Sequence, residues 1–161
     1  MYNTEMPLQK EELLRYQAQL FDPASLAPWQ QRGLKALESL DFPTIRHEEW
    51  KYTNLQRLLK LPFALGKGLE FSASDRPHWP GQSPESQLIV LVNGLFRPDL
   101  SQIHSPASEM RVLSLRQANA QYPELVKAHL DRYTRPEEEA LTALNAAFAQ
   151  DGAFCVCARP H

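Results

Sequence analysis

Prolines limit the length of every regular element in this chain. The 161 residues include thirteen prolines and only six glycines, whereas average usage is about 7% glycine and about 5% proline. A proline fixes its own φ angle and pushes the preceding residue out of the helical region. We therefore expect many short elements with stiff joints. The length and the 43% of apolar residues suit one packed domain or a small domain with a lead-in segment.

Apolar spacing predicts two helices near the N-terminus. The first covers residues 8–21 and ends at Asp22 and Pro23, because the residue before a proline avoids the helical conformation. The second covers residues 28–40, with Pro28 in the first helical position. Its apolar positions recur at helical intervals, at Trp29, Gly33, Ala36, Leu37 and Leu40.

A connector rich in aromatic and charged residues follows. Residues 41–55 show no clean periodicity and are expected to be an ordered link, which leads into a short helix from Leu55 that stops before Pro62. Residues 1–62 thus form one predicted segment. Residues 63–86 form the next, a flexible loop, because glycine, serine and proline dominate its composition.

Residues 87–151 are predicted to hold a hairpin and helices. The run 87–92 precedes Asn93 and Gly94, the residues typical of a type I′ turn, and Pro98 ends the second arm. Residues 110–115 alternate apolar and polar side chains and could add a third strand.

Two more helices are expected before the C-terminus. The first lies between Pro123 and Tyr133, and the second begins at Pro136, where the acidic run 137–139 would stabilise the positive end of the helix dipole. Gly152 is placed to stop this helix. The predicted class is therefore α+β: an N-terminal helical domain with a small antiparallel sheet.

The run 153–157 reads as a strand that begins close to the end of the chain, in a last segment of residues 152–161. Its backbone groups require a neighbouring strand. Either it pairs with the hairpin or its natural neighbour is missing, and in the second case we expect the unpaired edge to favour self-association.

Charge and composition exclude several classes of partner. Seventeen basic and nineteen acidic residues give a net charge of -2, so no positive field attracts nucleic acid. The longest apolar run, 88–92, is far too short for a membrane span, and the N-terminus lacks the pattern of a secretory signal. Two cysteines are too few for a disulfide framework. A cytoplasmic protein is expected.

Catalytic templates are not matched. Residues 65–68 lack the hydroxyl residue and the length of a phosphate-binding loop, and residues 47–51 place Lys51 where a zinc protease needs its second histidine. No nucleophile elbow is present. We expect no enzyme activity, no catalytic, cofactor-binding or metal-binding residues, and no cofactor for this chain.

Two side-chain clusters leave alternatives open. Cys155 and Cys157 share one face of a strand, and with His161 they could form a soft-metal carrier site shared across a dimer. The favoured interpretation is that both thiols are buried structural residues. Likewise, Trp50 and Tyr52 could dock a protein partner, although packing between helices, together with Phe42 and Leu55, is favoured. His129 is expected to be a half-buried packing residue.

Three ordered stretches carry a resemblance to a known family. Residues 42–55 include a Pro-Thr pair, a basic pair and Glu-Trp-Lys-Tyr-Thr, residues 90–96 include Val-Asn-Gly, and residues 141–152 include Leu-Asn-Ala-Ala-Phe and Asp-Gly. In this order they are similar to the N-terminal region of the SufD scaffold subunits, within the SufB/SufD family of the Suf iron–sulfur cluster assembly system.

The resemblance implies a non-catalytic scaffold that acts with SufB and the ATPase SufC, while the iron–sulfur cluster is handled by the complex. Family members continue into a long right-handed β-helix and a C-terminal helical segment that carry these contacts. This chain ends at His161, so it is expected to be an N-terminal fragment that stops at the first strand of an absent β-helix. No functional residue of the family transfers to a position in this chain.

Overall fold

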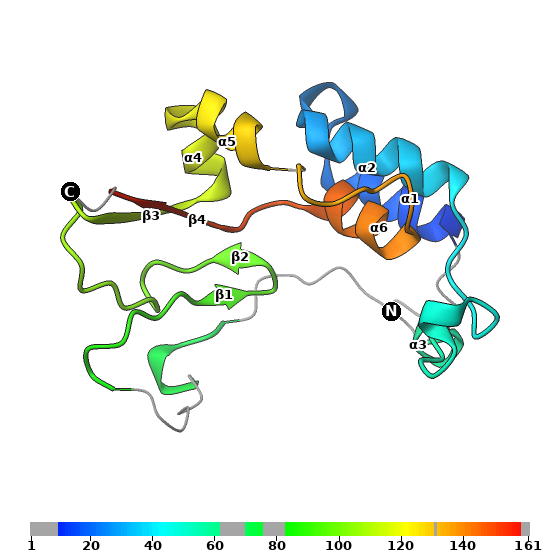
Figure 1. The fold of residues 1–161 in the computed structure, drawn as a ribbon, viewed down its shortest axis with the longest axis horizontal. Coiled ribbons are helices and arrows are strands. Elements are labelled where there is room, and N and C mark those ends of the chain that lie inside the picture. The colour runs from blue at the N-terminus through cyan, green and yellow to red at the C-terminus, as the bar shows by residue number, and fades with distance from the viewer. Residues whose placement is uncertain (1–9, 62–69, 76–82, 131, 159–161) are drawn as a thin grey trace. The chain divides into compact units, whose positions relative to one another are not determined.

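The computed structural model describes residues 10–61, 70–75, 83–130 and 132–158. The chain forms two compact units: Met1–Leu65 with His129–Ala149, and Gly66–Ala128 with Gln150–His161. The described residues form six α-helices and two two-stranded antiparallel sheets, which confirms the α+β class (Figure 1). The four segments expected from the sequence stay a prediction, and most of the loop predicted at 63–86 lies outside the described residues.

The first unit is helical. The two N-terminal helices lie within the predicted ranges, and residues 8 and 9 of the first range lie outside the described residues. The first helix ends just before Asp22, which caps the 3₁₀ turn that follows: its side chain accepts the Ala24 N–H at 3.0 Å. The short helix before Pro62 is also confirmed. The helical elements of this unit are α1 (Lys10–Leu20), η1 (Pro23–Ser25), α2 (Pro28–Ser39), η2 (Glu48–Trp50), α3 (Gln56–Leu59) and α6 (Ala140–Phe148).

Close contact between α2 and α6 forms the core of this unit (Figure 1). A Cβ added at Gly33 would lie 2.5 Å from the backbone nitrogen of Ala147 and 2.9 Å from the carbonyl oxygen of Ala143. Only glycine therefore allows this approach. Leu37 is fully buried beside the alanines of α6, so small residues form the contact and larger apolar side chains surround it.

Gln30 joins the start of α2 to the end of α6. Its Oε1 accepts the Ala27 N–H at 2.9 Å, and its Nε2 donates to the Ala149 carbonyl at 2.9 Å. The first bond satisfies a free backbone donor at the helix start and the second an acceptor after the last turn of α6. This polar side chain is only 6% exposed, and its two bonds offset the loss of contact with water.

The start of α6 differs from the prediction. The helix begins at Ala140 rather than Pro136, because Glu139 is its N-cap and accepts the backbone N–H groups of Leu141 and Thr142 at 3.0 and 2.7 Å. The acidic run is therefore not a uniform helix-start feature. Glu137 pairs instead with Arg32 of α2 and Glu138 with Arg135.

The second unit contains the predicted hairpin. Asn93 and Gly94 have φ angles of 50° and 80°, and two successive positive φ values are the signature of a type I′ turn. The paired part is shorter than the run 87–92, which adds only an isolated bridge from Leu88 to Gln102. The elements of this part of the chain are η3 (Ala73–Asp75), β1 (Leu91–Val92), β2 (Leu95–Phe96), β3 (Met110–Ser114), α4 (Leu115–Gln121), α5 (Pro123–His129) and β4 (Ala153–Cys157).

The third strand predicted at residues 110–115 is present at Met110–Ser114, but it does not join the hairpin. β3 pairs with β4 in a separate antiparallel sheet, with Met110 opposite Cys157 and Ser114 opposite Ala153 (Figure 1). The final strand therefore has a partner within the chain, and this partner is not the hairpin. Alternation predicted that β3 was a strand, but it carries no information on which strand lies beside it.

Helix α4 is absent from the sequence-based prediction. It follows β3 directly and begins at a capping box, in which the Ser114 hydroxyl accepts the Gln117 N–H at 3.0 Å and the Gln117 side chain accepts the Ser114 N–H at 3.2 Å. The Ser-x-x-Gln spacing is a recognised helix-start signal. It was the local pattern that could have revealed this helix.

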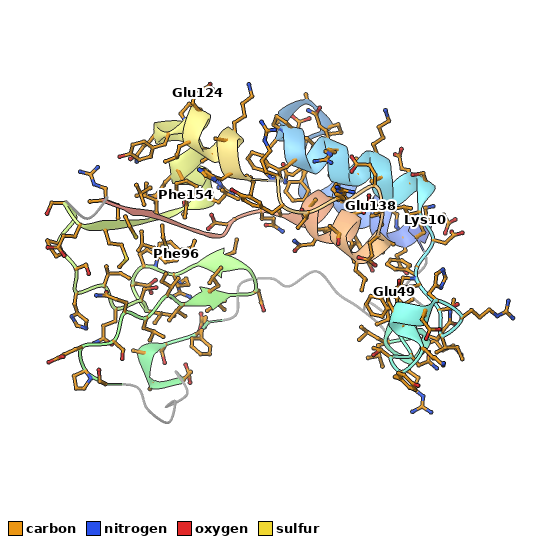
Figure 2. The ribbon with its side chains drawn as sticks, in the orientation of Figure 1. Lys10, Glu49, Phe96, Glu124, Glu138 and Phe154 are labelled. Atoms are coloured by element: carbon orange, nitrogen blue, oxygen red, sulfur yellow. The ribbon has the colours of Figure 1, made fainter. Side chains whose placement is uncertain are left out.

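Asp151 and Gly152 have a role other than ending α6, which stops at Phe148. The Asp151 carboxylate accepts the Phe96 N–H of the hairpin at 3.1 Å and the Arg116 N–H of α4 at 3.5 Å. The Gly152 carbonyl accepts the Leu115 N–H at 2.8 Å. These two residues therefore connect β4 to α4 and to the hairpin, whose buried Phe96 is labelled in Figure 2.

None of the helices in the described ranges has the length and apolar character needed to cross a bilayer.

Substitution of Gly33 tests the α2–α6 contact. We expect Gly33→Ala to lower the free energy of unfolding by about 1–3 kcal/mol, because the new methyl group meets backbone atoms that cannot rotate away. Urea unfolding followed by circular dichroism measures the change. Gly152→Ala is the matched control, because its Cβ would meet only the Leu115 Cβ, at 3.9 Å. Equal stability of the Gly33 variant and the native chain would contradict the close packing.

Candidate functional site

The connector exposes several apolar and aromatic side chains. Tyr52 is 93% exposed, so the expected packing of this residue between helices is wrong. Trp50 and Leu55 are half-buried, and Phe42 packs against the α2–α6 core as expected. We call Ile45, Tyr52, Leu58 and Leu61, which are 54%, 93%, 48% and 52% exposed, the connector surface.

Local contacts hold the backbone beneath the connector surface. The Thr44 N–H donates to His47 Nδ1 at 3.1 Å, and the His47 N–H donates to the Thr44 carbonyl at 3.0 Å. A 3₁₀ turn, η2, follows. Figure 2 shows the side chains near Glu49 extending away from the backbone of this turn. The connector is thus ordered, as predicted, and its Ile45 and Tyr52 side chains are exposed.

A charged side chain lies beside the exposed Tyr52 ring. Lys51 Nζ lies 5.7 Å from the centroid of the Tyr52 ring and 3.7 Å from Glu48 Oε1. A cation near a ring face is attracted by the ring quadrupole. The arrangement offers a partner protein an aromatic side chain and a cation. Tyrosine is among the residue types enriched at the hot spots of interfaces.

The two thiols form a second exposed group. Cys155 and Cys157 are both exposed, so the favoured interpretation of buried structural thiols is wrong. They share one face of β4, as residues two apart on a strand must. Their cross-strand neighbours are Val112 and Met110 of β3. An alternating apolar strand predicts one buried face, but alternation alone cannot show whether the cysteines occupy that face.

The three-ligand metal site considered from the sequence is not assembled by the described residues. Within them, no group of three or more His, Cys, Asp or Glu side chains could hold a metal ion. His161 lies outside those residues. His129 is exposed rather than half-buried, and its Nδ1 lies 2.9 Å from the Tyr133 hydroxyl.

Three carboxyl groups with lowered pKa values belong to exposed hydrogen-bonded pairs. The hydrogen bond from Arg32 lowers the pKa of Glu137, the bond from Arg97 lowers the pKa of Asp99, and the Ser72 hydroxyl lowers the pKa of Asp75. A lowered carboxyl pKa favours the folded state at neutral pH. That contribution is lost as the pH falls through the folded pKa.

Thiol labelling tests the exposure of β4. We expect both cysteines to react with a maleimide in the native protein as fast as in urea, because neither side chain is covered. Mass spectrometry at successive times counts the labelled thiols. A thiol that reacts only after unfolding would be buried. That result would contradict the exposure of the face of β4 that carries the cysteines.

Comparisons with known proteins place these features in a family. The model for the SufBD protein N-terminal region matches residues 11–159. An iron–sulfur cluster assembly SufBD family protein of Synechocystis sp. is 33% identical over 119 residues, which cover 73% of this chain and 26% of that protein. The chain therefore spans about a quarter of the length of this relative. No solved structure matches the chain.

Proposed function

The chain belongs to the SufBD family through the N-terminal region of that family, and from this premise we propose that it takes part in iron–sulfur cluster assembly. In this proposal it is part of a cytoplasmic, non-catalytic scaffold subunit. The scaffold acts with SufB and the ATPase SufC. The observation that carries the proposal is the family match over residues 11–159, which contains all three motif stretches noted in the sequence.

The length of the relative supports the proposal that different regions of such a scaffold carry different functions. The matched relative is named for iron–sulfur cluster assembly, and the alignment covers only 26% of it. We propose that cluster chemistry and ATPase docking belong to regions beyond the part matched here. The N-terminal region then supplies an ordered domain and a contact surface.

Co-purification tests the scaffold function. The gene that encodes this chain, with any downstream coding sequence kept intact, is tagged in its own organism. We expect SufB and SufC to co-purify with its product. We also expect deletion of the gene to lower the activity of an iron–sulfur enzyme such as aconitase, measured against a cluster-free enzyme as control. Normal aconitase activity, with neither partner recovered, would refute the proposal.

A specific observation favours a second role, protein docking through the connector. Tyr52 is 93% exposed although it lies within residues 42–55, one of the three stretches that carry the family resemblance. Tyrosine is enriched among the few residues that dominate the binding energy of interfaces. We propose that the connector surface is where this region contacts a protein of the assembly system.

Two tyrosines provide a matched test of the connector surface. Tyr52→Ala should weaken binding to the co-purified partner at least about tenfold, equivalent to about 1.4 kcal/mol, without changing the melting temperature. Tyr133→Ala is the control, because Tyr133 is 80% exposed but lies outside the connector. Binding is measured by calorimetry. If both variants bind like the native protein, Tyr52 is not part of an interface.

A further inference from the structure

We propose that one face of the β3–β4 sheet is a copper(I) site with three sulfur ligands, Cys155, Cys157 and Met110. The site uses only residues within the second unit, and it is independent of the proposed scaffold function. Unlike the arrangement considered from the sequence, it needs neither His161 nor a second copy of the chain. It follows from the strand register and from the exposure of both thiols.

The register places the thioether beside the thiols. Met110 is the direct cross-strand partner of Cys157, and Cys155 lies at the diagonal position two residues earlier on β4. Direct partners project to the same face of a sheet, and a long side chain also reaches a diagonal neighbour. The flexible methionine, which is half-buried, can therefore place its sulfur near both thiols.

The hydrogen-bond pattern brings Met110 and Cys157 especially close. The Ala158 N–H donates to the Glu109 carbonyl at 2.8 Å, so the pair before Met110–Cys157 is hydrogen-bonded. Hydrogen-bonded and non-bonded pairs alternate in an antiparallel sheet, which makes Met110–Cys157 a non-bonded pair. The Met110 N–H accordingly donates to Pro106, within its own segment. In such pairs the Cα atoms are about 4.5 Å apart.

The spacing of the two cysteines suits a bridging metal better than a disulfide. Their Cα atoms are roughly 7 Å apart, given a rise of about 3.4 Å per residue along a strand. A disulfide needs Cβ atoms roughly 3.5–4.5 Å apart, so it would require β4 to bend away from β3. A metal bound about 2.3 Å from each sulfur lets the thiolates stay farther apart and preserves the strand.

The ligand chemistry selects the metal. Thiolate and thioether groups are soft ligands that favour copper(I), whereas carboxylates and water suit magnesium or calcium. Within the described part of the chain, no cluster of histidine and acidic side chains completes a tetrahedral zinc site here. Copper(I) is stable with two or three sulfur ligands. Binding displaces one proton from each of the two thiols, so two protons are released for each ion.

Anaerobic titration of the full chain with copper(I), in competition with a bathocuproine chelator, tests the site. We expect one ion to bind. Cys155→Ser and Cys157→Ser should each lower the affinity by more than about a hundredfold, since loss of an outer-shell partner alone lowers it ten- to a hundredfold. Met110→Leu, which conserves side-chain volume, should lower it roughly tenfold. X-ray absorption should show three sulfur neighbours.

Controls separate this site from adventitious binding. Met6→Leu removes a methionine far from β3 and β4 in the sequence and should leave the affinity unchanged. Circular dichroism of every variant checks the fold, and Cys155→Ala replaces the serine variant if that one fails to fold. Unchanged affinity in the double cysteine variant would overturn the site. Unchanged affinity after Met110→Leu, or only two sulfur neighbours, would overturn the three-sulfur geometry.

Discussion

The contact between α2 and α6 at Gly33 is the constraint on which the first unit depends. It joins helices that are far apart in the sequence, and backbone atoms of one helix occupy the space that a side chain on the other would need. Since the contact leaves no room for larger residues, alanines line α6 where it meets α2. The buried Gln30 then satisfies the backbone at both helix ends. Close packing and hydrogen bonding thus both stabilise the contact between α2 and α6.

In the second unit, Asp151 has a comparable role. Its carboxylate accepts backbone N–H groups from the hairpin and from α4, and the adjoining glycine carbonyl accepts one more from the start of that helix. Hydrogen bonds to a charged acceptor contribute more than neutral ones. This short stretch therefore connects elements that local propensity alone would leave independent. The Asp-Gly pair noted in the family resemblance acquires a physical explanation as a junction rather than a helix stop.

The connector surface and the face of β4 that carries Cys155 and Cys157 are of functional interest because their side chains are exposed. In both, residue types that usually lie in cores or interfaces are accessible to solvent: Tyr52 in the connector, and the two cysteines on β4. The connector surface carries an exposed tyrosine and exposed aliphatic side chains, and Lys51 lies beside that tyrosine, which is the basis of the proposed docking role. The face of β4 with the two cysteines instead depends on β3, which places the Met110 thioether opposite Cys157.

The sequence by itself determined the features that act through neighbouring residues. Pro28 starts its helix through its own φ angle, Asn93 and Gly94 form the turn because they tolerate positive φ, and three ordered motifs identify the family. The Ser114–Gln117 capping box was equally local and was overlooked. Only the tertiary structure decided that β4 pairs with β3, that Tyr52 points to solvent and that the thiols are accessible. Those outcomes depend on contacts with segments that are distant in the chain. The alternation of side chains along a strand does not reveal which strand or helix lies beside it.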